Sequence, residues 1–220
     1  MIDCNTAFIQ FEREHQGNPP YGIAEFWLRH HDLYETGVSL LPQYTVSHEA
    51  RRAVDSWLSE HNPQGKPMVG IVLRAGDPVR DWDFDNKAGT IAAWLHTSGY
   101  LPVGIDWQRP LNSPYGLSYV GKRLDSVAAL LERCKVVLTP DTGLLHLAQA
   151  VGTPQVALWG IMPPELRVAD YDCVVVPKES LGYCAATDGD CRCSWKFQQW
   201  SCLRRITPTM IINGLQEVLG

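Results

Sequence analysis

One stretch of the sequence, residues 136–160, constrains the fold more than any other. A short apolar run, Val136–Leu138, enters it and predicts a buried strand. Pro140 then disfavours helix just before it, Asp141 is a good helix N-cap, and the helix that follows is expected to end at Gly152. A second apolar run comes next and ends at a glycine. Strand, tight turn, helix and strand predict an α/β sheet, in which ligands bind where strands end and helices begin.

The start of this predicted helix suits an anion. Its first backbone N–H groups have no partner inside the helix, and the helix dipole favours negative charge there. Gly143 has no Cβ, so a phosphate could approach the backbone closely. Thr142 and His146 are four residues apart and share a helix face. The alternative is that Asp141 only caps the helix and that His146 is an ordinary half-buried histidine.

The order of residues in this stretch also resembles a known family motif. Asp-Thr-Gly-x-x-His-x-Ala-x-Ala, followed by Gly-Thr-Pro and an apolar strand ending in Gly, resembles the donor-site signature of glycosyltransferase family 9, the lipopolysaccharide heptosyltransferases. The resemblance is strongest over residues 119–160, weaker from Met68 to the C-terminus, and absent before Met68. It implies the C-terminal, donor-binding half of the two-domain B-type glycosyltransferase fold.

Apolar runs near residues 68, 100, 117, 136, 155 and 173, separated mostly by helical patterns, predict one doubly wound, Rossmann-like parallel sheet of the α/β class. Asp125 is expected to cap the helix that precedes residue 136. A Pro- and Gly-containing loop at 61–67 predicts a boundary between an N-terminal segment, 1–66, and a donor-binding domain, 67–220. Within the first segment, helices are expected at 21–34 and from the N-cap Ser47 onward.

The short N-terminal segment departs from the family. The family carries a full acceptor-binding domain there, with the general base, so no catalytic base is named for this chain. The resemblance leaves three readings open: a minimal acceptor half, an acceptor half supplied by a partner or second subunit, and a truncated gene.

A second candidate segment follows the strand predicted at residues 68–73. Arg80-Asp81-Trp82 stands where the family has Lys-x-Trp, which implies a phosphate role for Arg80, and an arginine can hold a diphosphate through two parallel hydrogen bonds. The alternative is a surface arginine paired with Asp77, Asp81 or Asp83. Arg74, at the carboxyl end of the strand, is a further candidate for donor binding.

Asp106 follows the strand predicted at 100–105. A carboxylate in this place can bond ribose or base groups, and the family often has an acidic residue after the matching strand. Trp107, next to it, could stack on a base or pack against the core.

The resemblance implies a glycosyltransferase that takes a sugar, with a heptose as one option, from a nucleotide diphosphate sugar and passes it to a glycan or glycolipid. The donor diphosphate would rest at Thr142 and Gly143, and His146 and Arg80 would offset charge on the leaving diphosphate. Asp141 would bind sugar hydroxyls or cap the helix. No metal or other cofactor is required. Two other classes stay open: a nucleotide-sugar-binding module or donor subunit without activity of its own, and a nucleotide-sugar epimerase or hydrolase.

Composition limits the partners and the compartment. The net charge of −5 gives no support for nucleic-acid binding. No apolar run reaches the roughly 18 residues that a membrane helix needs, and the first ten residues lack the pattern of a signal peptide. We therefore expect a cytoplasmic protein, with peripheral contact at the inner membrane surface as an option.

Four of the seven cysteines lie near the C-terminus. Their spacing, C-x6-C-x-C-x8-C, is unlike that of zinc fingers, yet four thiolates could hold zinc. Family 9 proteins often carry a cysteine-bearing loop here, which implies structural thiols, and a disulfide is the third reading. The cysteines concerned are Cys184, Cys191, Cys193 and Cys202.

Overall fold

A computed structural model describes residues 11, 14, 22–36, 39–76, 80–160, 164, 167–168, 174–176, 203 and 205–220. Its strands are β1 (Met68–Val72), β2 (Leu101–Asp106), β3 (Leu117–Val120), β4 (Cys134–Pro140), β5 (Gln155–Leu158) and β6 (Val174–Val176). Its helices are α2 (Ile23–His30), α3 (His48–His61), the short η2 (Phe84–Asn86), α4 (Lys87–Thr97), α5 (Leu124–Leu131), α6 (Gly143–Ala150) and α9 (Pro208–Leu219). Helices separate most of these strands, as the apolar pattern predicts, although β3 follows β2 without a helix between them.

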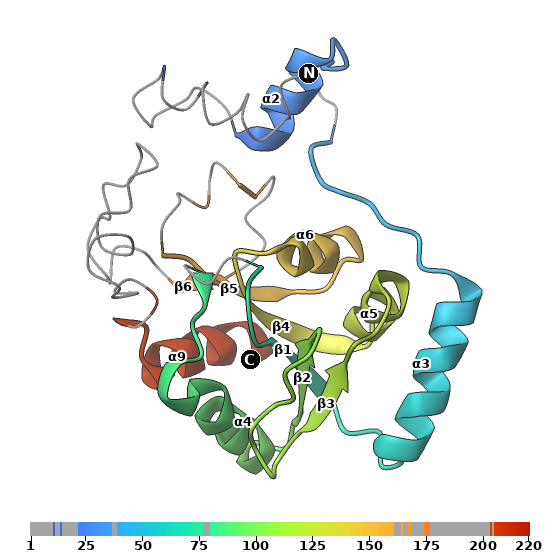
Figure 1. Ribbon diagram of the computed structural model, residues 1–220, viewed down its shortest axis with the longest axis vertical. Helices are drawn as coiled ribbons and strands as arrows, with labels where there is room; N and C mark the ends of the chain where they lie inside the picture. Colours follow the sequence, from blue (N-terminus) through green and yellow to red (C-terminus); the bar gives the residue numbers. More distant parts are fainter. Residues whose placement is uncertain are drawn as a thin grey trace.

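The strands form one six-stranded sheet in the order β3-β2-β1-β4-β5-β6 (Figure 1). Every pairing between neighbours is parallel. The chain runs outward from β1 through β2 to β3, then returns to place β4 on the other side of β1. The predicted doubly wound sheet is therefore confirmed, and its topological switch point lies between β1 and β4, where ligands bind in this class of fold.

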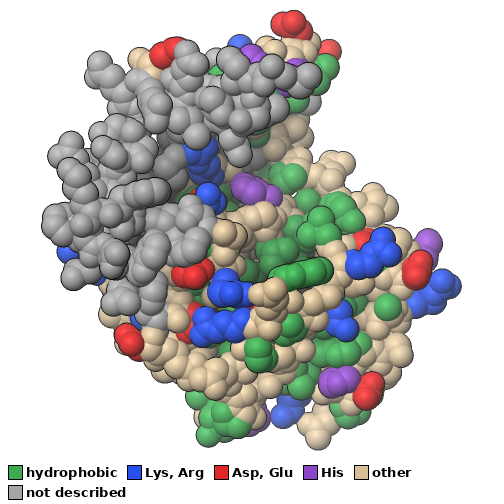
Figure 2. All heavy atoms as spheres, viewed as in Figure 1, with side chains coloured by type: hydrophobic (Ala, Val, Ile, Leu, Met, Phe, Trp, Pro, Cys, Tyr) green, Lys and Arg blue, Asp and Glu red, His purple; other side chains and the backbone are tan. Residues whose placement is uncertain are grey.

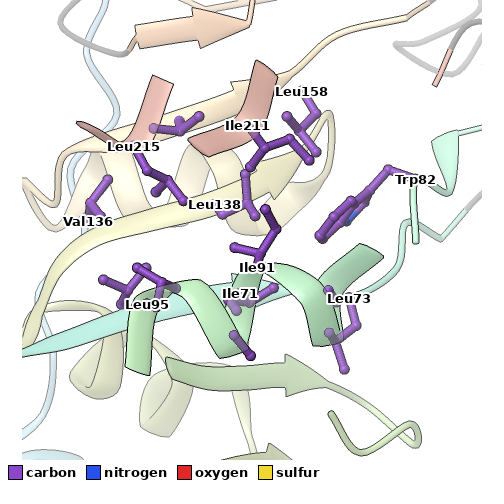
Figure 3. Packing of buried hydrophobic residues seen from close by; sticks show 14 of the residues in the cluster. Ile71, Leu73, Trp82, Ile91, Leu95, Val136, Leu138, Leu158, Ile211 and Leu215 are labelled. Carbon is purple, nitrogen blue, oxygen red and sulfur yellow. The ribbon is translucent and has the colours of Figure 1, made fainter. Parts of the chain in front are cut away.

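Helices α4 and α9 cover one face of the sheet. Figure 3 shows Ile91 of α4 and Ile211 of α9 close to Ile71 and Leu138, which project from β1 and β4. Each of these four side chains is fully buried. Because both faces of β1 are covered, all five of its residues are buried, and the strand appears in the sequence as a continuous apolar run rather than an alternating one.

Helices α3, α5 and α6 contribute to the apolar cluster on the opposite face. Helix α3 begins after Ser47, whose side chain accepts a hydrogen bond from Ala50 N at 3.1 Å, so the predicted cap is confirmed. Val46, Ala50 and Val54 pack into the same cluster as residues of α5. Residues 44–58, before β1, thus contribute to the hydrophobic core of the sheet.

Asp125 has a different role from the predicted one. The N-cap of α5 is Arg123, and its side chain makes no capping bond. Asp125 lies inside the first turn and reaches outward: its carboxylate accepts hydrogen bonds from Ser47 Oγ at 2.5 Å and Ser47 N at 3.2 Å. The Tyr44 hydroxyl donates a third bond at 3.3 Å. The carboxylate is used to hold the segment before α3 on α5, because a side chain one turn into a helix can contact a neighbouring element.

Ion pairs join α3 and the end of α5 further along. Arg51 donates to both carboxylate oxygens of Glu132 at 2.8 and 2.9 Å, and Arg133 lies 2.6 Å from Asp55. Within the described part of the chain, no helix is both long enough and apolar enough to cross a bilayer.

Candidate functional site

Two loops meet at the switch point of the sheet, one after β1 and one after β4. Arg80 NH1, on the first loop, lies 3.2 Å from the backbone oxygen of Asp141 and 3.4 Å from its Oδ2. The Arg80 side chain is 42% exposed and that of Asp141 14%. The structure thus brings together two segments that are some sixty positions apart in the sequence and that sequence analysis selected separately.

The residues next to Arg80 fix the first loop. Trp82 is fully buried, and its Nε1 donates to the backbone oxygen of Val72 at 2.9 Å. Asp81 accepts a hydrogen bond from Ala75 N at 3.0 Å. Three consecutive residues therefore divide the work: Trp82 anchors the loop to the end of β1, Asp81 closes it, and Arg80 points toward β4.

The described carboxylates predicted as alternative partners of Arg80 bond other groups. Asp81 bonds Ala75, and Asp83 pairs with Arg109 instead, with NH2 and Oδ2 2.5 Å apart. Asp77 lies outside the described residues. Arg80 pairs with Asp141 across the switch point, so neither described carboxylate of the predicted alternatives holds it.

The N-cap of α6 is Thr142, not Asp141. Its backbone is extended, and its Oγ1 accepts a hydrogen bond from Leu144 N at 3.2 Å. The prediction of Asp141 as cap is wrong by one residue, because strand β4 continues through Pro140 and the threonine hydroxyl reaches the free N–H first. Asp141 is left facing Arg80. A Cβ added at Gly143 would meet no atom within 4 Å, so the space beside the helix start is open.

His146 lies one turn into α6, half-buried. Burial lowers its pKa, the charge of Asp141 raises it and that of Arg167 lowers it, with a net downward shift. Arg167 stands near a loop residue, Val168, that packs against Leu145 of α6. Asp141 and Arg167 thus act on the ring with opposite signs, and burial favours its neutral form, in which one ring nitrogen donates and the other accepts.

We expect an NMR titration of the free protein to give His146 a pKa below its ordinary 6.5. An added nucleoside diphosphate should raise that pKa, because a nearby anion favours the imidazolium. The lowered pKa also links folding to pH, because the unfolded chain binds this proton more readily than the folded one. The contribution of His146 to the free energy of unfolding is therefore present above pH 6.5 and is lost as the pH falls toward its lowered pKa. His146→Gln assigns the signal. An unchanged pKa on adding the nucleotide would exclude an anion beside the ring.

The carboxylate of Asp106 accepts hydrogen bonds from within the protein. Arg74 donates to its two oxygens at 2.7 and 2.8 Å, and the backbone N–H groups of Gln108 and Arg109 add bonds at 2.8 and 2.7 Å. Burial opposes ionisation, but these four bonds outweigh it and lower the pKa of Asp106 to about 2. Its side chain is 4% exposed and that of Arg74 37%, so the group that faces solvent at this edge is the arginine. The contact of Asp106 with ribose or base stays a prediction.

Two arginines near these residues, Arg109 and Arg167, are not among the predicted site residues. Arg109 pairs with Asp83, whose side chain is 3% exposed. The position of Arg109 just after β2 is a usable signal, whereas nothing in the sequence pairs it with Asp83. Trp107, also after β2, is 67% exposed, which excludes the prediction that it packs against the core.

Figure 2 shows this face of the molecule with arginine and lysine side chains gathered near its middle, beside acidic side chains and a histidine. Among the residues that the structure describes, no group of three or more His, Cys, Asp or Glu side chains is placed to hold a metal ion. Cys184, Cys191, Cys193 and Cys202 lie outside those residues, so their three readings stay predictions.

Comparison with known proteins first gives a class. Residues 120–172, which include the whole of β4, α6 and β5, match the model of glycosyltransferase family 9 (heptosyltransferase). This confirms the resemblance drawn from the Asp141–His146 motif: over these residues the chain is similar to glycosyltransferase family 9.

Several individual proteins are similar to this chain. Lipopolysaccharide heptosyltransferase 2 of Salmonella typhimurium is 26% identical over 196 residues, covering 82% of this chain and 54% of the relative. A solved family 9 glycosyltransferase of Veillonella parvula superposes with a TM-score of 0.73 at 18% identity, covering 92% of this chain and 61% of that one. The Escherichia coli ADP-heptose lipopolysaccharide heptosyltransferase II gives 0.62 at 20% identity, covering 91% and 62%.

These superpositions confirm the fold: an α/β sheet of the B-type glycosyltransferase kind. The chain spans about half the length of the Salmonella relative and about three fifths of each of the two structures.

Proposed function

We propose that this chain is a glycosyltransferase that takes a sugar from a nucleotide diphosphate sugar and transfers it to a glycan or glycolipid, with residues 67–220 as the donor-binding domain. The observation that carries the proposal is the contact of Arg80 with Asp141 at the switch point, beside the open start of helix α6. The family match over residues 120–172 supports the reaction class.

An ADP-linked heptose is the donor we propose to test first. The structural neighbour from Escherichia coli is named for ADP-heptose, and the Salmonella relative is named a heptosyltransferase. A donor of this kind carries two negative charges on its diphosphate, which suits a site with arginine side chains and a helix N-terminus.

In the proposed reaction, the bond between the anomeric carbon of the sugar and the diphosphate oxygen breaks, and an acceptor hydroxyl oxygen bonds to that carbon. Negative charge then grows on the leaving diphosphate. Arg80, a ring N–H of His146 and the positive end of the α6 helix dipole are the groups proposed to stabilise it. The hydroxyl proton passes to a base that we do not assign.

Asp141 has a separate proposed part. Two anions repel, so its carboxylate is better suited to sugar hydroxyls than to the diphosphate. Its present contact with Arg80 is long, at 3.4 Å, and half open to solvent on the arginine side, so the guanidinium can shift to a phosphate at low cost. Asp106, one strand away, is proposed to contact the nucleotide portion, and Arg74 to contribute to donor binding.

The proposal is tested by ligand-induced stabilisation with ADP-, UDP-, GDP- and CMP-sugars. A ligand at 100 times its dissociation constant stabilises the folded state by roughly 2.7 kcal/mol, which gives a readily measured rise in Tm. We expect a rise with ADP-heptose. No rise with any nucleotide sugar would reject donor binding as a whole.

Turnover separates the two leading classes. A transferase releases nucleoside diphosphate when donor and acceptor are both present, whereas a binding module or donor subunit binds without release. Release without an acceptor, at the same rate as with one, would instead favour a hydrolase.

A further inference from the structure

Arg74 and Arg109 lie just beyond the carboxyl ends of β1 and β2, and a buried carboxylate binds each guanidinium. Arg74 comes two residues after β1 ends, and Arg109 comes three residues after β2 ends. They share a connection, because Asp106 bonds both the guanidinium of Arg74 and the backbone N–H of Arg109. Their side chains therefore leave the protein from one small region.

In both pairs the carboxylate is buried and the guanidinium is partly exposed. The Asp106 and Asp83 side chains are 4% and 3% exposed, whereas those of Arg74 and Arg109 are 37% and 38% exposed. The negative groups lie inside and the positive groups lie outside. An approaching ligand thus meets guanidinium N–H groups first.

The carboxylates are themselves fixed. Asp83 Oδ1 accepts the backbone N–H of Ala88 at 2.7 Å, at the start of α4, while Asp106 accepts two backbone N–H bonds. A guanidinium held by such a group has lost much of its side-chain freedom before a ligand arrives, which lowers the entropic cost of binding. Each arginine uses one side of its fork for the carboxylate and keeps further N–H donors for another oxyanion.

We infer that Arg74 and Arg109 form a phosphate-binding pair, one strand away from the start of α6. This inference rests on the proposed function, and it adds Arg109 as a substrate-binding residue and a phosphate group as its ligand. The phosphate could belong to the donor diphosphate or to a phosphorylated acceptor, and the chemistry recognised is the same.

Asp81 is the charge that opposes this pair. It interacts electrostatically with both arginines, and burial raises its pKa despite the bond from Ala75 N. Of the five charged groups here, it is the carboxylate without an arginine partner of its own. A proton on Asp81 when an anion arrives would remove that opposing charge.

The test is calorimetric titration of the full chain with ADP, pyrophosphate and adenosine. Arg109→Gln should weaken ADP and pyrophosphate about tenfold and leave adenosine unchanged, with Arg109→Lys in between because lysine keeps the charge without the fork. Arg133→Gln is the control: it removes an arginine of similar exposure, 43% against 38%, which pairs with the exposed Asp55 away from the switch point. Circular dichroism confirms that each variant is folded.

The outcomes separate the inference from the proposed function. If the wild type binds ADP and Arg109→Gln binds ADP and pyrophosphate equally well, the pair is rejected and donor binding stands. If pyrophosphate binds through Arg109 while no nucleotide binds, the pair stands and the donor proposal falls. Loss of pyrophosphate alone, with ADP unaffected, assigns the pair to a phosphorylated acceptor; no binding of any of these ligands to the wild type rejects both.

Discussion

Replacing Arg80 with alanine should lower kcat/KM for sugar transfer by about 10²–10³-fold, the usual effect of removing one preorganised group that stabilises transition-state charge. The guanidinium is the cation that the structure places against Asp141, and half of it is open to an incoming diphosphate. The rate of transfer is measured as the release of nucleoside diphosphate at several donor concentrations. The fold should be unaffected, because the contact of Arg80 with Asp141 is partly exposed and such pairs contribute little to stability.

Two further variants sharpen this result. Arg80→Lys restores the family's lysine in the Lys-x-Trp motif and should recover much of the lost rate. Arg133→Ala removes a comparable charge remote from the switch point and should leave transfer unchanged. A fall of less than threefold in Arg80→Ala would contradict a role for this side chain in the leaving-group site.

Replacing Trp82 with alanine should destabilise the protein by about 3–5 kcal/mol, the range for truncating a fully buried large aromatic side chain. Trp82 has no exposed surface and packs in the cluster of β1, α4 and α9. The change also leaves the backbone oxygen of Val72 without its indole donor. The free energy of unfolding is measured by urea titration followed by circular dichroism, because eight tryptophans complicate fluorescence.

The tryptophans supply their own controls. Trp107→Ala, at a side chain that is 67% exposed, should change the free energy of unfolding by less than about 0.5 kcal/mol. Trp82→Phe keeps most of the volume and removes the N–H, and should cost about 1–2 kcal/mol. Equal stabilities for Trp82→Ala and Trp107→Ala would show that the loop is not anchored through Trp82.

Much of this fold can be predicted from the sequence because its signals are local. Parallel strands buried on both faces appear as apolar runs, and the cap Ser47 directly precedes its helix. The strand, turn and helix around Asp141 also depend on neighbouring residues only. The Arg80 segment could be selected because Arg80-Asp81-Trp82 resembles the Lys-x-Trp motif of glycosyltransferase family 9.

The partners of individual carboxylates could not be predicted in this way. Asp106 bonds Arg74 across 32 positions, and Asp125 bonds Ser47 across 78. Such pairs depend on how separate elements pack, and an aspartate after a strand looks the same whether it faces ribose or an arginine. The cap of α6 was misplaced for a smaller reason: Asp141 and Thr142 are both good caps, and the length of β4 decides between them.

The three bonds that Asp125 accepts from Tyr44 and Ser47 have a consequence for anyone who shortens this protein. A fragment cut at the loop of residues 61–67 would lose α3 and uncover apolar side chains of α5 that Val46, Ala50 and Val54 now shield. Exposed apolar surface of that kind favours aggregation. An expression fragment that keeps the parallel sheet should therefore begin ahead of Tyr44.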